Sequence, residues 1–333
     1  MAGRPRRRHP LTESDAAGLY GPGSAAWARN RDAFLLLGAG PRALLLQLAH
    51  PLVAEGVAQH SAFRADPWSR LAGTLRSYLR IVYASRAGAN AEIARLNRLH
   101  RSITGAVQDP EARAVTGVTA YAARDPALSL WVHATLVEST LALNEAWRGP
   151  LPPGEAARFY VETIPIARAF GIPERILPAD LAAFRAWWDA MLGPGGPIRV
   201  TPTARDLAAT ILAPPLAPLA GAGRGGVLPA ELRPLLAAIP PRTAGWLLWP
   251  SIALLPPSIL AGYGIPWSPG RAAVATWLVA GWRGWAAVLP KAWGTMPQAR
   301  AADRRIARAA DLRIARAADL RIARSLAEAA ASP

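Results

Sequence analysis

The chain of 333 residues contains no cysteine. Disulfide bonds, thiolate zinc sites, iron–sulfur clusters and thiol nucleophiles are therefore excluded. Lysine is almost absent as well, because Lys291 is the only one and arginine carries the remaining positive charge. Together with the heavy use of alanine, glycine and proline, this bias indicates a GC-rich genome rather than a special arginine chemistry.

The net charge is +16, and half of it lies in the two tails. Residues 1–10 carry +4, and residues 300–333 carry another +4 from eight arginines and four acids. Basic tails attract phosphates and anionic lipid headgroups without reading any sequence. We therefore expect no specific nucleic-acid partner.

Long uninterrupted apolar runs are also missing. The basic cluster "RPRRR" is followed by "HPLTESD" rather than by the apolar stretch of a signal peptide, so we expect a cytoplasmic protein. The Trp-rich segment 246–290 is broken by prolines in its first half and carries Arg283 in its second. It predicts buried core helices rather than a membrane span, with peripheral contact at a membrane surface as the alternative.

Proline and aspartate mark the starts of several helices. We expect helices over 51–62, 67–84, 89–106 and 123–147, and two more in "PPGEAARFYVETIPIARAFG" and "PADLAAFRAWWDAML". Residues 34–51 read as a short apolar run, a glycine turn and a helix. Because no series of alternating strands is visible, the predicted fold class is all-α, a single large helical domain with disordered or marginally helical tails.

Three regions are predicted. Residues 1–30 form a basic arm, residues 31–299 form the helical domain, and residues 300–333 form an Arg/Ala-rich tail. The tail repeats "AADLRIAR" with a period of eight, which does not match the heptad of a coiled coil. We expect it to be solvated and dispensable for folding.

One motif at the predicted glycine turn resembles a dinucleotide fingerprint. "GAGPRA" at residues 38–43 follows an apolar run and fits the Gly-x-Gly-x-x-Gly/Ala pattern. However, Pro41 replaces a backbone amide that would face the phosphates, and no further βα units follow. The fingerprint is therefore a weak indication of nicotinamide or flavin binding.

The histidines carry more information. Four of the five fall within 84 residues, and they are His50, His60, His100 and His133. His100 lies in an apolar stripe with Ile93, Leu96, Ile103 and Val107, opposite Glu92, Arg95 and Arg98. A buried imidazole without a partner costs about 1–3 kcal/mol. His60, His100 and His133 lie on the apolar faces of three separate predicted helices, and three such histidines favour a shared ligand.

Haem suits such a set of residues. The His-Glu-x-x-His motif of zinc enzymes and the Glu-x-x-His pairs of di-iron bundles are both absent. Haem brings four nitrogens of its own and asks the protein for one or two ligands. Arg70 and Thr74 share a face of the helix over 67–84, where an arginine could bind a haem propionate or could simply be solvated.

Four motifs in order resemble the MpaB-type oxygenase family, which is related to the latex-clearing proteins or rubber oxygenases. They are "GPRALLLQLAHPLVAEGVAQHS", "RADPWSRLAGTL", "RLNRLHRSITG" and "DPALSLWVHATLVES", and the resemblance covers residues 25–300. It implies a globin-related helical bundle with haem b, dioxygen as co-substrate, and oxidation of apolar, often isoprenoid, substrates.

The resemblance also assigns residues. His100 matches the iron ligand of the rubber oxygenases, with His133 as the fallback, and Arg70 and Thr74 match the residues of a helix that lies across the haem. His50 and His60 are expected to line the pocket or to orient dioxygen. Two features depart from the rubber oxygenases: Gly73 stands in place of a distal lysine, and Glu55 is only the nearest candidate for their catalytic glutamate. Rubber itself is therefore not the expected substrate.

The function expected from the sequence is a haem b-dependent oxygenase acting on an apolar small molecule such as an isoprenoid or an alkene. Two alternatives stay open. One is a haem-binding sensor or carrier without turnover, and the other is a cofactor-free helical protein that docks on a membrane surface. The electron donor and the oligomeric state are not predicted.

Overall fold

The computed structural model describes residues 12–61, 67–212, 248–288 and 294–331, without the side chains of 67–71, 282, 285–287 and 322–331. The elements are α1 (Glu13–Ala17), α2 (Ala25–Asn30), α3 (Ala33–Leu48), α4 (Pro51–His60), α5 (Pro67–Tyr83), α6 (Arg86–Arg101), β1 (Thr104–Ala106), α7 (Pro110–Thr116), β2 (Ala120–Ala122), α8 (Pro126–Arg148), α9 (Glu155–Ala169), η2 (Glu174–Ile176), α10 (Leu181–Leu192), α11 (Pro202–Leu212), α15 (Pro257–Gly262), α16 (Pro269–Val288) and α17 (Pro297–Ala331). The predicted all-α class is confirmed.

The described strands form a single small ribbon. β1 and β2 pair antiparallel, with Gly105 opposite Tyr121. Gly105 allows a close approach here, because a Cβ at this position would lie 2.7 Å from the Tyr121 hydroxyl. β1 begins directly after α6, so the ribbon lies at the C-terminal end of that helix.

The helix starts agree with the capping signals in the sequence. The Asp125 side chain accepts a hydrogen bond from the Ala127 amide at the start of α8, and His50 caps α4 just before Pro51. Asp66, the expected cap of α5, lies outside the described residues. Helix α6 begins at Arg86 and ends at Arg101, so Ile103 and Val107 lie beyond the helix rather than on its apolar stripe.

Residues 34–51 differ from the prediction of a glycine turn. α3 is one continuous helix that runs through Gly38, Gly40 and Pro41, so "GAGPRA" forms no phosphate-binding loop. The reason is packing. A Cβ at Gly38 would lie 2.3 Å from the Trp147 ring, so glycine lets α3 and α8 approach closely rather than turning the chain.

α8 is the central helix of the bundle. Its buried residues pack against α3, α9, α10 and α11, as the apolar character of the sequence over 123–147 predicted. Trp131 is fully buried, stacks on Trp188 with ring centroids 5.0 Å apart, and donates its indole N–H to the Leu46 carbonyl. The core therefore lies around the N-terminal half of α8.

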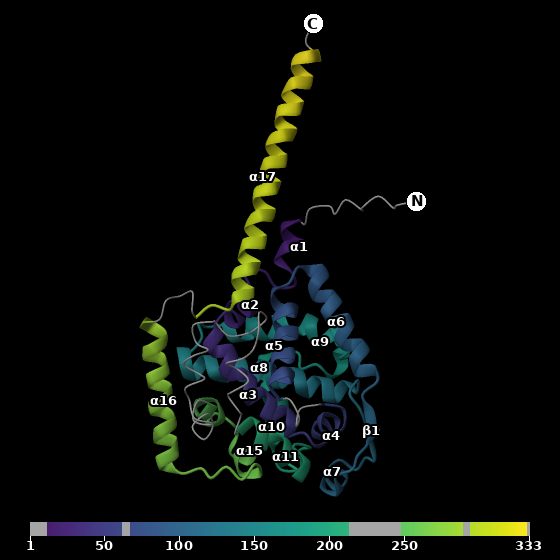
Figure 1. Cartoon of the computed structure of the whole chain (residues 1–333), viewed down its shortest axis with the longest axis vertical. Coiled ribbons are helices and arrows are strands. Elements are labelled where there is room, and N and C mark those ends of the chain that lie inside the picture. Colours follow the sequence, from purple (N-terminus) through teal and green to yellow (C-terminus); the bar gives the residue numbers. More distant parts are fainter. Residues whose placement is uncertain (1–11, 62–66, 213–247, 289–293, 332–333) are drawn as a thin grey trace.

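The two predicted tails differ from expectation where they are described. Residues 13–30 form α1 and α2, and Ala25, Ala26 and Trp27 are buried, so this part of the predicted arm belongs to the bundle. α17 is a long helix that projects from the bundle beside α1 (Figure 1). Its first turns pack into a cluster with Trp27, Leu79 and Tyr83 through Ala299 and Ala302.

No single one of the described helices is long and apolar enough to cross a bilayer. α3 and α4 reach the required length and composition only as a pair, and a bend of 103° separates them.

Candidate functional site

A charged cluster holds α5 against α6. Glu92 of α6 is buried, and its Oε1 accepts hydrogen bonds from Nε and Nη2 of Arg95 at 3.1 and 2.6 Å. Its Oε2 lies 3.5 Å from Nε of Arg80 on α5. Arg95 also donates to Oγ of Ser77 on α5 at 2.9 Å. The Arg95 guanidinium holds the pKa of the Glu92 carboxyl below its ordinary value, so the cluster is charged at neutral pH.

These contacts fix the register of the two helices. α5 and α6 are joined by a short turn and run antiparallel, and the contacting pairs are Ser77 with Arg95 and Arg80 with Glu92. In both pairs the residue numbers add to 172. Because both helices rise equally per residue, His100 lies level with residue 72. The cluster therefore places His100 at the height of Arg70 and Thr74.

The α5–α6 hairpin is closed at one end and open at the other. Near its turn, Leu79, Val82, Ala89 and Ile93 are buried. Two turns further on, Thr74 is exposed and His100 is half-buried. A Cβ added at Gly73 would meet no atom within 4 Å. The open end is thus the place in the described hairpin where a flat ligand would have room.

His100 continues the inner face of α6. Ala89, Ile93, Leu96 and His100 follow one another at helical spacing, and burial decreases along this face towards the open end. Asn97, beside His100, donates to the Ala169 carbonyl at the end of α9. Arg70 lies in α5 at this height, but its side chain is outside the described part.

His133 lies on α8, and its ring is engaged with α9. Its Nε2 lies 3.3 Å from Oγ1 of Thr163. The Thr163 hydroxyl gives its only proton to the Tyr160 carbonyl, so Nε2 of His133 must donate in this contact. Burial lowers the pKa of His133 to about 4, so the ring is neutral at pH 7. As placed, His133 would have to break the Thr163 contact to bind a metal through Nε2.

His50 and His60 have structural contacts of their own at the two ends of α4. The buried His50 accepts a hydrogen bond from the Leu52 amide through Nδ1, and burial lowers its pKa to about 4. His60 is exposed, and its Nε2 lies 3.0 Å from the carbonyl of Thr104, four residues after His100. Of the two, His60 is the one whose contact leads to the end of α6.

Glu55 is held by hydrogen bonds on every side. Its carboxylate accepts from the amides of Gln108 and Asp109, from the Gln59 side chain and from the Thr203 hydroxyl. These four donors fix the buried carboxylate between α4, α7 and α11. The contacts indicate a structural role for Glu55 rather than that of a base.

A haem asks the protein for fewer ligands than a bare metal ion does. Among the residues that the structure describes, no three histidine, aspartate or glutamate side chains converge as a metal site would require. An iron that arrives with four porphyrin nitrogens needs only one imidazole. His100, half-buried at the open end of the hairpin, offers a side chain of the kind that such an iron binds.

The sequence reasoning missed the cluster that aligns these residues. Glu92 was placed on the polar side of α6, whereas it is buried together with the inner face. The signal was available in part, because Glu92 and Arg95 are three residues apart and can pair on a helix. The spacing within α6 could not show that Ser77 and Arg80 of the neighbouring helix contact Arg95 and Glu92.

Two curated relatives are similar to part of the chain. They are the uncharacterized proteins Mb2261 of Mycobacterium bovis and Rv2237 of Mycobacterium tuberculosis, each 27% identical over 154 residues. The match covers 45% of this chain and 57% of theirs, so it spans little more than half the length of these relatives. No solved structure matches the chain significantly.

A family model gives a broader match. It is described as the catalytic domain of the ER-bound oxygenase mpaB/B' and rubber oxygenase, and it covers residues 27–290. This range extends from α2 to the end of α16 and includes both helices of the α5–α6 hairpin. The chain therefore belongs to the family of mpaB and rubber oxygenase catalytic domains.

Proposed function

We propose that the protein is a haem b-dependent oxygenase that uses dioxygen to oxidise an apolar small molecule. Membership of an oxygenase family supports the reaction class. The observation that carries the assignment of the site is the register of α5 and α6, which brings His100 level with Arg70 and Thr74. The proposed ligand residue on one helix is then at the height of two polar residues on the other, at the open end of the hairpin.

His100 is the proposed iron ligand. The α6 backbone holds it, and the Glu92 cluster two turns away holds α6 against α5. His133 is the fallback ligand. As placed, its neutral ring joins α8 to α9 through the contact of Nε2 with Thr163.

Arg70 and Thr74 act from α5. The Arg70 guanidinium would bind a haem propionate by a charge-assisted hydrogen bond, and the Thr74 hydroxyl would donate to a polar atom beside it. A Cβ at Gly73 would meet no atom within 4 Å, and a small apolar substrate would find room on this side of α5. His60, whose contact with Thr104 leads to the end of α6, would help to orient the substrate or dioxygen. When bound, the haem would supply the redox chemistry that activates dioxygen.

The first experiment measures haem binding. The full-length protein, purified from haem-replete cells, should show a Soret band and a haem b pyridine haemochrome. His100→Leu should fold with an unchanged circular dichroism spectrum and lose most of its haem, whereas His133→Leu should retain it. Loss of haem from His133→Leu with retention by His100→Leu would move the ligand to α8. A protein without haem, even after reconstitution, would refute the proposal.

The second experiment separates an oxygenase from a haem carrier. The haem-loaded protein is incubated with squalene, an apolar alkene, under ¹⁸O-labelled dioxygen. Label in the products, lost with Thr74→Val at unchanged haem content, supports turnover at this site. Full haem occupancy without labelled product from squalene or from shorter alkenes would favour a carrier.

A further inference from the structure

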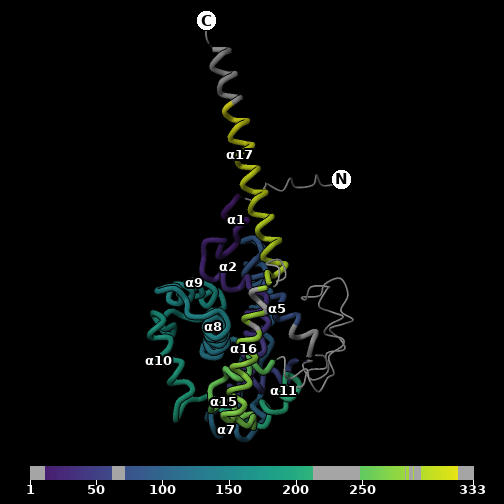
Figure 2. Tube along the Cα trace, turned by 90° about the vertical axis from the view of Figure 1, so that its left-hand side faces the viewer, coloured from purple at the N-terminus to yellow at the C-terminus, as the bar shows by residue number. Residues whose placement is uncertain are grey.

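α16 lies on the outside of the bundle and has a face that no described element covers. It runs along one edge of the molecule in Figure 1 and lies at the front when the molecule is turned by 90° in Figure 2. Ala275 is its buried residue, and Arg283 ties the helix to the end of α8 by donating to the carbonyls of Glu145 and Ala146. The opposite side of the helix is exposed.

This exposed side is apolar along its length. Ala273, Trp277, Ala280, Gly284 and Val288 follow one another at spacings of three and four and are all exposed. Trp277 is 73% exposed and Val288 79%, whereas large apolar side chains that serve only the fold are normally covered. A stable helix with such a face normally has a partner.

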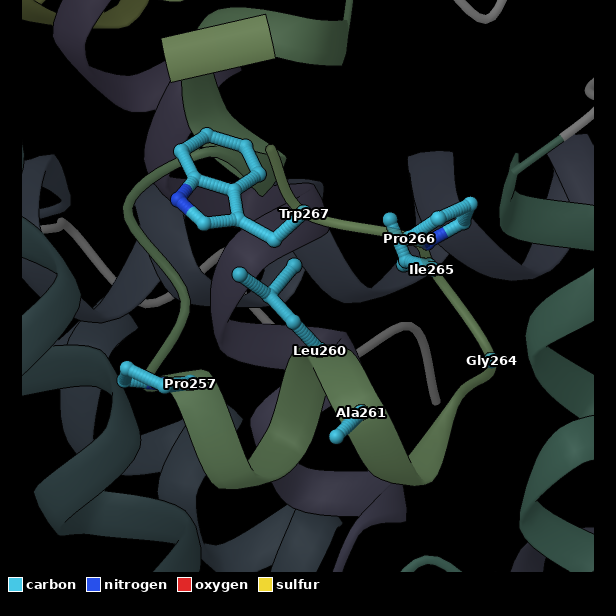
Figure 3. Close-up of a pocket in the computed structure, with 7 residues that line it drawn as sticks. All are labelled: Pro257, Leu260, Ala261, Gly264, Ile265, Pro266 and Trp267. Carbon is cyan, nitrogen blue, oxygen red and sulfur yellow. The ribbon is translucent and has the colours of Figure 1, made fainter. Parts of the chain in front are cut away.

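The apolar surface continues into the turn before α16. Trp267 is exposed and lies over a shallow hollow of about 400 Å³, where Leu260 of α15 points towards it (Figure 3). A second hollow of about 480 Å³ shares Ile265 and Pro266 and is lined by Val274. Because Val274 lies three residues before Trp277, the hollows and the stripe on α16 form one surface.

All charged side chains of the segment that contains α15 and α16 are positive. From residue 232 to residue 302 the chain contains no aspartate or glutamate, whereas Arg271, Arg283, Lys291 and Arg300 are positive. The Arg271 guanidinium lies 5.5 Å from the Trp249 ring at the edge of the second hollow. Tryptophan together with basic residues at the rim is the composition of surfaces that lie in the headgroup region of a bilayer.

We propose that the α15–α16 face, formed by Trp267, Val274, Trp277 and Val288, docks on the surface of an anionic lipid bilayer. Trp277 and Val288 enter the headgroup boundary, the hollows beside Trp267 accept the ends of acyl chains, and Arg271 faces the lipid phosphates. Since α16 packs along α8, the helix lies flat on the membrane rather than crossing it. The inference does not depend on haem binding.

The test is co-flotation of the full-length protein with unilamellar vesicles. Vesicles of phosphatidylcholine are compared with vesicles of phosphatidylcholine and phosphatidylglycerol in equal parts. The wild type should bind the mixed vesicles and should bind more weakly as salt rises. Trp277→Glu should lower the partition coefficient about tenfold or more, because a charge then replaces a large apolar side chain that docking on the bilayer would bury.

Val161→Glu is the matched control. Val161 is also an exposed apolar residue, 55% exposed, but it lies on α9 away from this face. This variant should bind as the wild type does, and both variants should keep the wild-type circular dichroism and melting temperature. Equal binding of Trp277→Glu and Val161→Glu would overturn the proposal. So would a wild-type dimer that Trp277→Glu splits and that does not bind vesicles, because the face would then join two copies.

Discussion

The carboxylate of Glu92 on α6 lies 3.5 Å from the guanidinium of Arg80 on α5, and the Glu92 side chain is only 5% exposed. This pair, with Arg95 and Ser77, is the described polar contact that sets the height of α6 relative to α5. The consequence for function lies two turns away, where the same register brings His100 level with Arg70 and Thr74.

Replacement of Glu92 should therefore affect both stability and haem retention. Glu92→Gln leaves Arg95 and Arg80 without their carboxylate, and we expect the free energy of unfolding to fall by about 1–3 kcal/mol at pH 7. Haem should dissociate faster from the variant than from the wild type. Urea unfolding and transfer of haem to apomyoglobin measure the two effects.

The dependence of stability on pH tests whether the negative charge of Glu92 is the cause of this stabilisation. The folded pKa of Glu92 is below its ordinary value of 4.5, so its contribution is fully present above that value and is lost as the pH falls through the lower folded pKa. The difference in stability between wild type and Glu92→Gln should accordingly shrink as the pH falls below 4.5 towards this lower folded pKa. Glu174, which pairs with Arg168 on the exposed surface, provides the control. If Glu174→Gln costs as much stability as Glu92→Gln, burial of the pair is not what matters.

Gly73 offers a test of the space opposite His100. We expect Gly73→Lys to place an amine there and to give the haem-loaded protein a low-spin spectrum, as a second axial ligand would. Lysine at an open helical position should also stabilise the haem-free protein by up to about 1 kcal/mol relative to glycine.

Gly281→Lys is the matched control for Gly73→Lys. Gly281 lies on α16 and has equally open surroundings. It should give a similar gain in stability without a spectral change. Identical spectra for the two lysine variants would show that Gly73 does not face the iron.

The helical content was predictable because it depends on local signals. Two helix starts are marked by Asp125 with Pro126 and by His50 with Pro51. These signals act within the first turn of the helix itself. The apolar character of α8 likewise predicted a central position. By contrast, the glycines of α3 were read as a turn, because a sequence does not show that Gly38 faces the Trp147 ring.

The candidate site was predictable only in its parts. The spacing placed His100 on the inner face of its helix, and Arg70 and Thr74 together on another. The height at which the two helices meet depends on the contacts of Glu92 with Arg80 and of Arg95 with Ser77, which join residues 12 and 18 positions apart. Periodicity within one helix contains no information about such a register.

His133 should make the haem-free protein sensitive to mild acid. Its folded pKa is about 4 because of burial, whereas the ordinary value is 6.5. The unfolded chain therefore binds more protons between these values, and stability should fall as the pH drops from 6.5 towards 4. Between pH 7 and pH 5 the loss due to one such histidine is about 2 kcal/mol.

His133→Gln isolates this contribution. Glutamine does not titrate and can still donate to Thr163, so the variant should lose about 2 kcal/mol less than the wild type between pH 7 and pH 5. His60→Gln, at an exposed position, should follow the wild type. An acid response of His133→Gln equal to that of the wild type would mean that the ring is hydrated in solution.

The repeat of α17 provides a comparison within one helix. Arg305, Arg313 and Arg321 occupy the same position in successive octads. Arg305 donates to the carbonyls of Ala16 and Tyr83 and lies beside the buried Ala302, whereas Arg321 is exposed. The first octad thus packs on the bundle, and whether residues from 301 onwards are dispensable for folding, as the sequence predicts, stays a prediction to be tested there.

Arg305→Ala should therefore destabilise the protein, and Arg321→Ala should not. Loss of Arg305 leaves two carbonyls without their donor, which we expect to cost about 1–3 kcal/mol. For a chain of this size, that corresponds to a fall in melting temperature of roughly 1–4 °C. Both substitutions remove the same charge and have the same effect on helix propensity, so a difference between them reports packing alone. If both variants melt with the wild type in differential scanning calorimetry, the repeat contributes nothing to folding and the bundle ends before it.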